Sequence, residues 1–234
     1  GGAGSQCGVA GYNAAKRDAS GGARAVGGCA RSRPCGWPGS VSAPLVFFVG
    51  GTRSGKSGLA QRWAEAQASR RLFLATCRVE DNDVEMAARV ARHQAGRGAG
   101  WFCVEEPLDP LTVLKGVLAG SSGQDGDAAG VTLLDCVSLW VANLLAVGLT
   151  SEEIQTRVAA LAVGLADEPG GRVRPMALVS AETGLGIVPS TPLGRVYRDV
   201  LGLANQTLAG VCTHVVFVSC GLPLALKGPL PEGL

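Results

Sequence analysis

The sequence lacks several features by which whole classes of protein are known. It has eight cysteines but no CxxC pair, and that spacing argues against a zinc site. Its longest apolar run, CVSLWVANLLAVGL at 136–149, is too short to span a bilayer. No continuous apolar segment near the first residue predicts a secretory signal. A formal net charge of only +2 predicts no broad basic face for nucleic acid.

The cysteines that are present predict a reducing, intracellular environment. Their spacing differs from the disulfide framework of a small secreted domain. Several stand in or beside apolar runs, where a thiol packs as a small hydrophobic side chain. These are Cys77, Cys103, Cys136, Cys212 and Cys220. We therefore expect a cytoplasmic protein, or an organellar one if the chain begins with a transit peptide.

Residues 1–44 predict a disordered leader. They contain eleven glycines, five basic residues and one acidic residue, and their apolar residues follow neither a strand nor a helix period. Two interpretations stay open: an organellar transit peptide, or an upstream stretch translated through mis-annotation. The rest of the chain predicts a single domain at 45–228 and a short tail at 229–234.

The predicted domain alternates apolar strands with amphipathic helices. Strands are predicted at 45–50, 71–76, 100–105, 131–135, 176–180 and 214–219. Helices are predicted at 56–69, 83–95, 111–119, 138–147, 151–166 and 194–209. Strands that are apolar throughout and separated by helices favour an α/β fold, with a mostly parallel sheet and helices on both faces.

The stretch GGTRSGKS matches the phosphate-binding loop pattern GxxxxGK[ST] and lies between a predicted strand and a predicted helix. In such a loop the glycines turn backbone N–H groups toward phosphates, Lys56 reaches the terminal phosphates, and Ser57 can ligate magnesium. With the sheet pattern, the loop predicts a RecA-like P-loop NTPase. The alternative is a chance glycine-rich turn. The candidate nucleotide-binding residues are Gly50, Gly51, Thr52, Arg53, Ser54, Gly55, Lys56 and Ser57.

Asp135 is the candidate second magnesium residue. It ends the predicted strand VTLLD, and P-loop proteins place a carboxylate at the end of a neighbouring buried strand. Alternatively, Asp135 caps the helix that follows, a position that aspartate fills well. The two roles are compatible.

His93 is the candidate nucleophile. In the predicted helix, Arg89 and Arg97 stand four residues on either side of it, and Arg92 is adjacent. Nearby cations favour the neutral, nucleophilic imidazole and attract phosphate oxygens. Alternatively, His93 shares an apolar stripe with Met86 and Val90, and packs at its edge.

Eight motifs, in order, resemble the bifunctional adenosylcobinamide kinase / adenosylcobinamide-phosphate guanylyltransferase family over about residues 45–228. They are GGTRSGKS, LAT, DVEMAARVARHQAGRGAGW, VEEP, LLDCVSLWVANLL, ETGLGIVP, GRVYRDVLGLANQ and VSCGLP. The resemblance implies phosphorylation of adenosylcobinamide with ATP or GTP, then transfer of GMP from GTP through a guanylylated histidine. It also implies Mg²⁺ as cofactor, a corrinoid substrate and a homotrimer.

Carried onto this sequence, the family's catalytic residues are His93 and Lys56, and its metal residues are Ser57 and Asp135. Beyond the loop, the implied nucleotide contacts are Thr76, Cys77, Arg78, Gln94, Ala95, Gly96, Arg97, Glu105 and Asp135. Two departures stand out: residues 76–86 are longer than the usual family spacing, and Ala181 replaces an expected asparagine. Two alternative functions stay open, a nucleotide-binding switch without turnover and a kinase that transfers only the γ-phosphate.

The segment ETGLGIVP at 182–189 has two interpretations. It is either a connection between strand and helix or a substrate-facing loop, since loops at the carboxyl ends of strands in such sheets bind ligands. Further along, Arg195, Arg198 and Asp199 form either a solvated helix face or a surface near the substrate or a subunit contact.

Overall fold

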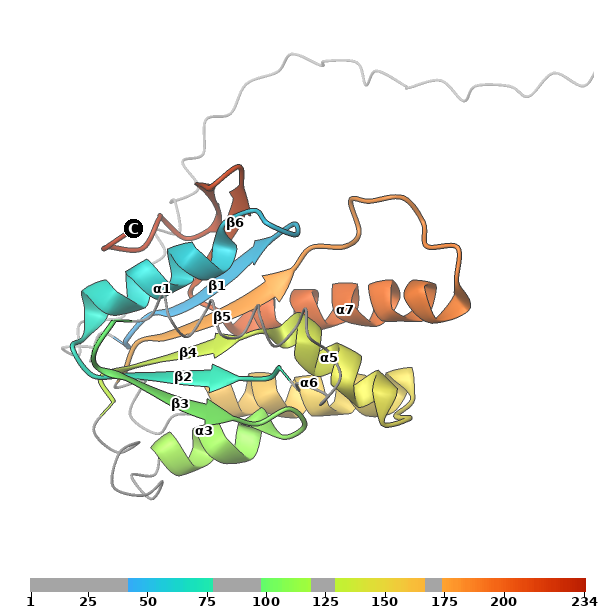
Figure 1. Ribbon diagram of the computed structural model, residues 1–234, viewed down its shortest axis with the longest axis horizontal. Helices are drawn as coiled ribbons and strands as arrows, with labels where there is room; N and C mark the ends of the chain where they lie inside the picture. The colour runs from blue at the N-terminus through green and yellow to red at the C-terminus, as the bar shows by residue number, and fades with distance from the viewer. Residues whose placement is uncertain (1–41, 78–97, 119–128, 167–173) are drawn as a thin grey trace, which may run out of the picture. The chain divides into compact units, whose positions relative to one another are not determined.

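The computed structural model describes residues 42–77, 98–118, 129–166 and 174–234. These residues build a seven-stranded sheet with the order β3-β2-β4-β5-β1-β6-β7 (Figure 1). Strands β1 to β6 run parallel to their neighbours, and β7 is antiparallel to β6. The strands are β1 (Leu45–Gly50), β2 (Arg71–Ala75), β3 (Trp101–Glu105), β4 (Val131–Asp135), β5 (Met176–Ala181), β6 (His214–Ser219) and β7 (Leu222–Lys227).

Helices cover both faces of the sheet. They are α1 (Lys56–Gln67), α3 (Pro110–Leu118), α5 (Val137–Ala146), α6 (Ser151–Ala166) and α7 (Pro192–Val211). Strand β1 shows the arrangement, because Phe48 packs with α1 on one face while Phe47 packs with α5, α6 and α7 on the other. Both side chains are fully buried. Burial of each contributes about 1.5–3 kcal/mol to folding, so the strand that leads into the phosphate loop is firmly fixed.

The predicted α/β class, with its P-loop and mostly parallel sheet, is confirmed. All six predicted strands are present, and five of the six predicted helices occur within two residues of their predicted ends. The helix predicted at 83–95 and most of the predicted leader lie outside the described residues. In the described part of the chain, no helix has the length and apolar character needed to cross a bilayer.

Two expectations need correction. Strand β7 was missed, because Pro223 interrupts its pattern and prolines demote a run to an edge strand or a loop. As an edge strand it exposes Leu222, Leu224 and Leu226. In addition, not every cysteine packs as a small hydrophobic residue. Cys136 and Cys212 are buried, but Cys103 and Cys220 are exposed, on the terminal strand β3 and in the β6–β7 turn.

The tail predicted at 229–234 packs against α1. Gln67 donates a side-chain hydrogen bond to the carbonyl of Glu232 at 3.1 Å. A Cβ on Gly233 would stand 2.9 Å from the Ala66 Cβ, so the chain passes close to the helix there. The last residues therefore brace the helix whose other end holds the phosphate loop.

Candidate nucleotide site

The phosphate loop connects the end of β1 to the start of α1, as the motif requires. Gly55 has φ +94 and Arg53 has φ +58, so two residues of the loop adopt the left-handed backbone conformation before the helix begins. The Lys56 ammonium donates to the carbonyl of Gly51 at 3.1 Å. It therefore lies back across the loop, in the place from which it would contact the phosphates of a bound nucleotide.

The turn between β6 and β7 packs against the phosphate loop and is hydrogen-bonded to it. Gly221 N–H donates to the Ser54 carbonyl at 2.8 Å. A Cβ on Gly55 would lie 3.2 Å from the Gly221 Cα, and one on Gly50 would lie 2.3 Å from the Val218 carbonyl oxygen. Both loop glycines thus allow a close approach of two backbones. Sequence analysis missed this contact, although the Cys-Gly pair after β6 was a turn signal.

The parallel strands bring Asp135 to the same edge of the sheet as the phosphate loop. In the sheet register Gly50 pairs with Ala181 on β5, and Asp135 pairs with Val179 on the same strand. Strand β5 therefore lies between the strand that ends in the phosphate loop and the strand that ends in Asp135. The cap position of α5 is Cys136, so the alternative in which Asp135 caps this helix is wrong.

The Cys136 thiol reports the electrostatics between these groups. Burial raises its pKa from 9.0 to about 11, and the negative charge of Asp135 adds to the rise. The positive charge of Lys56 acts in the opposite direction. The charges of the predicted phosphate-binding lysine and of the predicted metal carboxylate thus both act on this thiol, in opposite directions.

Thr76 ties the end of β2 to the end of β4. It is fully buried, its hydroxyl donates to the Cys136 carbonyl at 2.7 Å, and it accepts from the Cys136 N–H at 2.9 Å. The Asn143 side chain donates to the Thr76 carbonyl at 2.7 Å. These bonds hold the backbone beside Asp135 in place. The nucleotide contact of Thr76 stays a prediction.

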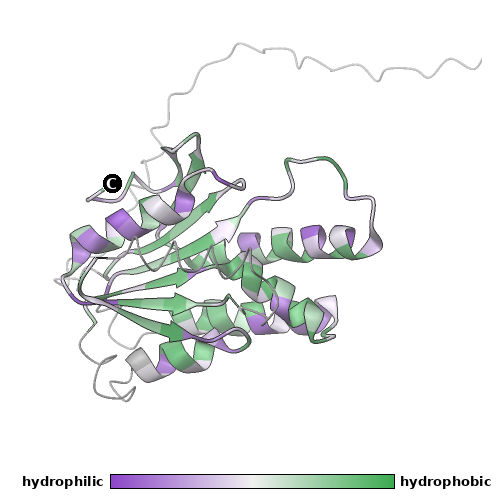
Figure 2. Ribbon diagram, in the orientation of Figure 1, coloured by the Kyte–Doolittle hydropathy of each residue, from purple (hydrophilic) through white to green (hydrophobic). Residues whose placement is uncertain are grey.

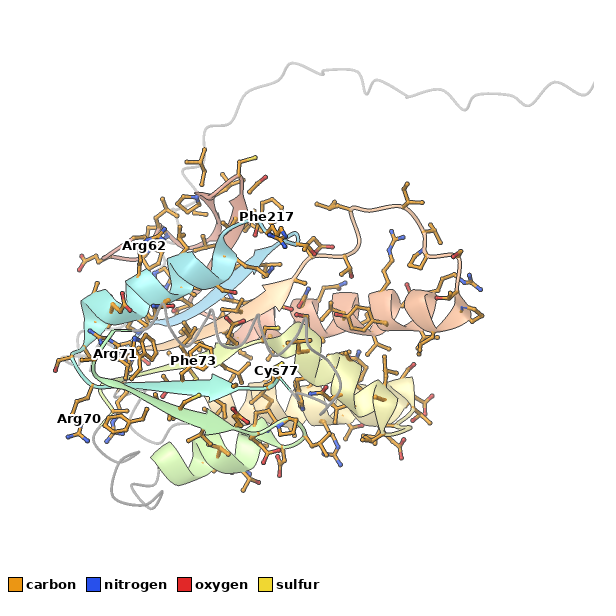
Figure 3. The ribbon with its side chains drawn as sticks, viewed as in Figure 1. Arg62, Arg70, Arg71, Phe73, Cys77 and Phe217 are labelled. Carbon is orange, nitrogen blue, oxygen red and sulfur yellow. The ribbon has the colours of Figure 1, made fainter. Side chains whose placement is uncertain are left out.

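Two further implied contacts, Cys77 and Glu105, lie on the other half of the sheet. Cys77 follows β2 at the carboxyl edge (Figure 3). Glu105 is exposed at the end of β3. Four strand spacings separate β3 from β1, which is about 19 Å. Glu105 is therefore too far from the phosphate loop to touch the same phosphates. The residues Arg78, His93, Gln94, Ala95, Gly96 and Arg97 lie outside the described residues.

At the position of the expected asparagine, an amide from another element supports the strand end. Asn205 on α7 donates to the Ala181 carbonyl at 3.0 Å, and its side-chain oxygen accepts from the Ser180 hydroxyl at 2.7 Å. These bonds hold the end of β5 against α7.

A phosphate loop between a central strand and a helix, with a carboxylate on the next strand but one, defines a P-loop nucleotide-binding protein. The family model described as "Cobinamide kinase / cobinamide phosphate guanyltransferase" matches residues 46–226. This chain belongs to that family.

Two relatives are similar to this chain over most of its length. The bifunctional adenosylcobalamin biosynthesis protein CobP of Pseudomonas aeruginosa is 38% identical over 182 residues, which covers 78% of this chain and 96% of that protein. The corresponding CobU protein of Salmonella typhimurium is 34% identical over 196 residues, covering 78% and 99%. Among solved structures, the RadB recombinase aligns with a TM-score of 0.44 and 13% identity, over 82% of this chain and 86% of that one.

Proposed function

We propose that this chain carries out two reactions on a corrinoid. It phosphorylates the aminopropanol hydroxyl of adenosylcobinamide with ATP or GTP, and it then transfers GMP from GTP to the product, giving adenosylcobinamide-GDP for cobalamin biosynthesis. The observation that carries this proposal is the phosphate loop with Lys56 and Asp135 at one edge, in a chain that matches the family model over residues 46–226.

In the kinase step, the backbone N–H groups of the loop and the start of α1 hold the phosphates. Lys56 leaves the Gly51 carbonyl and neutralises charge on the terminal phosphates as the hydroxyl attacks. The hydroxyl of Ser57 and the carboxylate of Asp135 are hard oxygen donors of the kind Mg²⁺ prefers, so they fit the ion. When bound, Mg²⁺ supplies further charge neutralisation.

In the transferase step, an imidazole nitrogen of His93 attacks the α-phosphorus of GTP. A P–N bond forms, and the P–O bond to pyrophosphate breaks. An oxygen of the corrinoid phosphate then attacks the same phosphorus and releases His93. Support comes from the family match and from the arginines at 89, 92 and 97, which favour the neutral imidazole.

The deciding experiment uses GTP labelled at the α-phosphate. Wild type, His93→Ala and His214→Ala are incubated with Mg²⁺, and protein-bound label that is acid-labile and base-stable is measured. His214 is the matched control, because it begins β6 at the opposite edge of the sheet and its ring bonds the neighbouring Thr213 hydroxyl at 2.8 Å. We expect label on wild type and His214→Ala alone. Label retained on His93→Ala would refute the transferase mechanism.

We also propose that the protein is a cytoplasmic homotrimer, as the family resemblance implies. Light scattering of the purified protein tests the assembly, with a mass of three chains as the expected result. A monomer or dimer with both activities would contradict it.

A further inference from the structure

The segment between β5 and α7, residues 182–193, projects beyond the carboxyl edge of the sheet (Figure 1). We call it the β5–α7 arm. Its hydrophobic stretch stands out in Figure 2, and the large apolar side chains are among the most exposed of the described residues. Leu185 is 81% exposed, Ile187 96%, and Val188 and Leu193 65% each. Apolar side chains gathered on a projecting loop mark a binding surface.

The arm is held in shape by polar contacts along its inner side. Arg198 on α7 donates to the Gly184 carbonyl at 2.6 Å. Arg195 donates to the carbonyls of Pro189 and Ser190 at 3.1 and 2.9 Å. Both arginines thus bond the arm's backbone, and their two alternative interpretations stay predictions. The large apolar side chains of the arm stay exposed beside these bonds.

The arm starts beside the phosphate loop. The Glu182 N–H donates to the Gly50 carbonyl at 3.0 Å, so the first residue of the arm is bonded to the first glycine of the loop. Strand β5, which carries the arm, lies between the loop strand β1 and the Asp135 strand β4. A molecule that brings a hydroxyl to the phosphate held by Lys56 therefore approaches alongside the arm.

The chemistry of the arm matches a broad acceptor that offers apolar surface. Residues 183–194 contain no charged side chain, so the outer surface offers apolar contact without an ionic preference. Cobinamide has a broad macrocycle with an amide-bearing rim, and the reacting hydroxyl stands at the end of one flexible side chain. Only that hydroxyl has to reach the phosphate. The macrocycle stays outside the sheet edge, where the arm projects.

We propose that the β5–α7 arm is the docking surface for the corrin macrocycle, with Leu185, Ile187 and Val188 against the ring while the aminopropanol side chain reaches the phosphate at Lys56. This inference rests on the proposed function and goes beyond it, because it assigns the residues that select a corrinoid over smaller alcohols. The arm acts through ground-state binding of the ring, so it affects KM for the corrinoid more than kcat.

The test compares two sets of substitutions at exposed leucine, isoleucine and valine residues. One variant carries Leu185→Ser, Ile187→Ser and Val188→Ser on the arm. The control carries Leu224→Ser and Leu226→Ser on β7, where both leucines are 60% exposed but stand away from the phosphate loop. Kinase KM and kcat, equilibrium dialysis of adenosylcobinamide, affinity for a fluorescent ATP analogue, and mass by light scattering are measured for each.

We expect the arm variant to raise KM and the dissociation constant for adenosylcobinamide by about tenfold or more, with nucleotide affinity and mass unchanged. The β7 control should match wild type. Unchanged corrinoid binding in the arm variant, with an active wild type, overturns the inference. A lowered mass together with lost activity also overturns it, because the arm is then a subunit contact. A wild type that binds nucleotide but neither binds nor phosphorylates the corrinoid refutes the proposed function itself.

Discussion

The two halves of the sheet are built differently. Around β1, the strands are buried on both faces and the phosphate loop is braced by the β6–β7 turn. At the other end β3 is the terminal strand, and Cys103, Val104 and Glu105 are exposed. The residues assigned to guanylyl transfer cluster in the sequence between β2 and β3. The comparison teaches that the phosphate loop follows a fully buried strand, whereas Glu105, an implied nucleotide contact, ends a strand that is largely exposed.

Strands β2 and β3, at the exposed end of the sheet, are also joined by side-chain contacts where the two strands begin. The Arg70 guanidinium lies over the Phe102 ring at 4.9 Å, and the Arg71 guanidinium lies 5.6 Å from the Trp101 ring centroid (Figure 3). Such contacts contribute about 0.5–1 kcal/mol each at exposed sites. They join β3 to β2 at the amino ends of the two strands. The carboxyl end of β3 stays exposed.

The largest expected effect tests whether the kinase and transferase reactions both use a nucleotide held by the phosphate loop. Lys56→Met should lower kinase turnover by about 10²–10³-fold, because the variant loses a charge that stabilises the transferring phosphate. It should also slow labelling of His93, because the same ammonium offsets charge on the departing pyrophosphate. Steady-state phosphorylation of adenosylcobinamide and α-phosphate labelling measure the two effects.

The matched variant is His93→Ala, which should abolish labelling while phosphorylation continues. Thermal unfolding of both variants checks that they are folded. Full labelling in Lys56→Met would mean that the two halves work on separate nucleotides, and the shared use of the phosphate loop would then be wrong.

The next effect tests the rigidity of the central half. Gly50→Ala should destabilise the protein by about 1–3 kcal/mol, because its Cβ would stand 2.3 Å from the Val218 carbonyl oxygen and must push two backbones apart. Gly202→Ala on α7 is the control, since apart from its own turns of the helix backbone nothing lies within 4 Å of its Cβ position. Alanine is the better helix former, so this variant should gain up to about 1 kcal/mol. Urea unfolding measures both, and equal stability would contradict a tightly packed loop.

A third effect tests the link between the halves. Thr76→Val removes the hydroxyl that bonds the Cys136 backbone across β2 and β4. We expect a loss of about 1–2 kcal/mol, because a buried N–H is left without its acceptor. Thr207→Val is the control, since its hydroxyl bonds the Leu203 carbonyl on an exposed helix face and the change should stay within about 0.5 kcal/mol. Urea midpoints compare them. A neutral Thr76→Val would mean that the strand ends are held by packing alone.

The sequence predicted the features that local patterns determine, and it missed those that depend on contacts between distant elements. The loop, its flanking strand and helix, and Asp135 were all predicted, because local patterns carry them: a glycine-rich motif, and buried strands that read as apolar runs. The strand order was not, since nothing local states that β5 lies between β1 and β4. Gly221 under the loop and Asn205 behind Ala181 come from distant elements, and only the folded chain brings them to the site.

The smallest effect concerns the pH dependence of stability due to Cys136, which follows β4 in the middle of the sheet. Its pKa is raised from 9.0 in the unfolded chain to about 11 in the folded one, mainly by burial and then by the charge of Asp135. The folded state thus keeps a proton that the unfolded state loses, so stability is fully present below pH 9 and falls as pH rises toward 11. At pH 10 the loss from this thiol is about 1 kcal/mol.

Cys136→Ala should therefore show a smaller drop in urea midpoint between pH 8 and pH 10 than wild type. Comparing slopes within each protein separates this effect from the cavity that the substitution leaves. Tyr197 remains in both proteins, and its pKa is raised from 10.0 to about 12 first by burial and then by the charge of Cys136. Cys136→Ala removes that second cause, which lowers the pH-dependent loss from Tyr197 in the same direction as the loss from the thiol. Identical slopes would show that the thiol beside Asp135 is less enclosed than the structure indicates, and water would then reach the carboxylate that we propose as a metal residue.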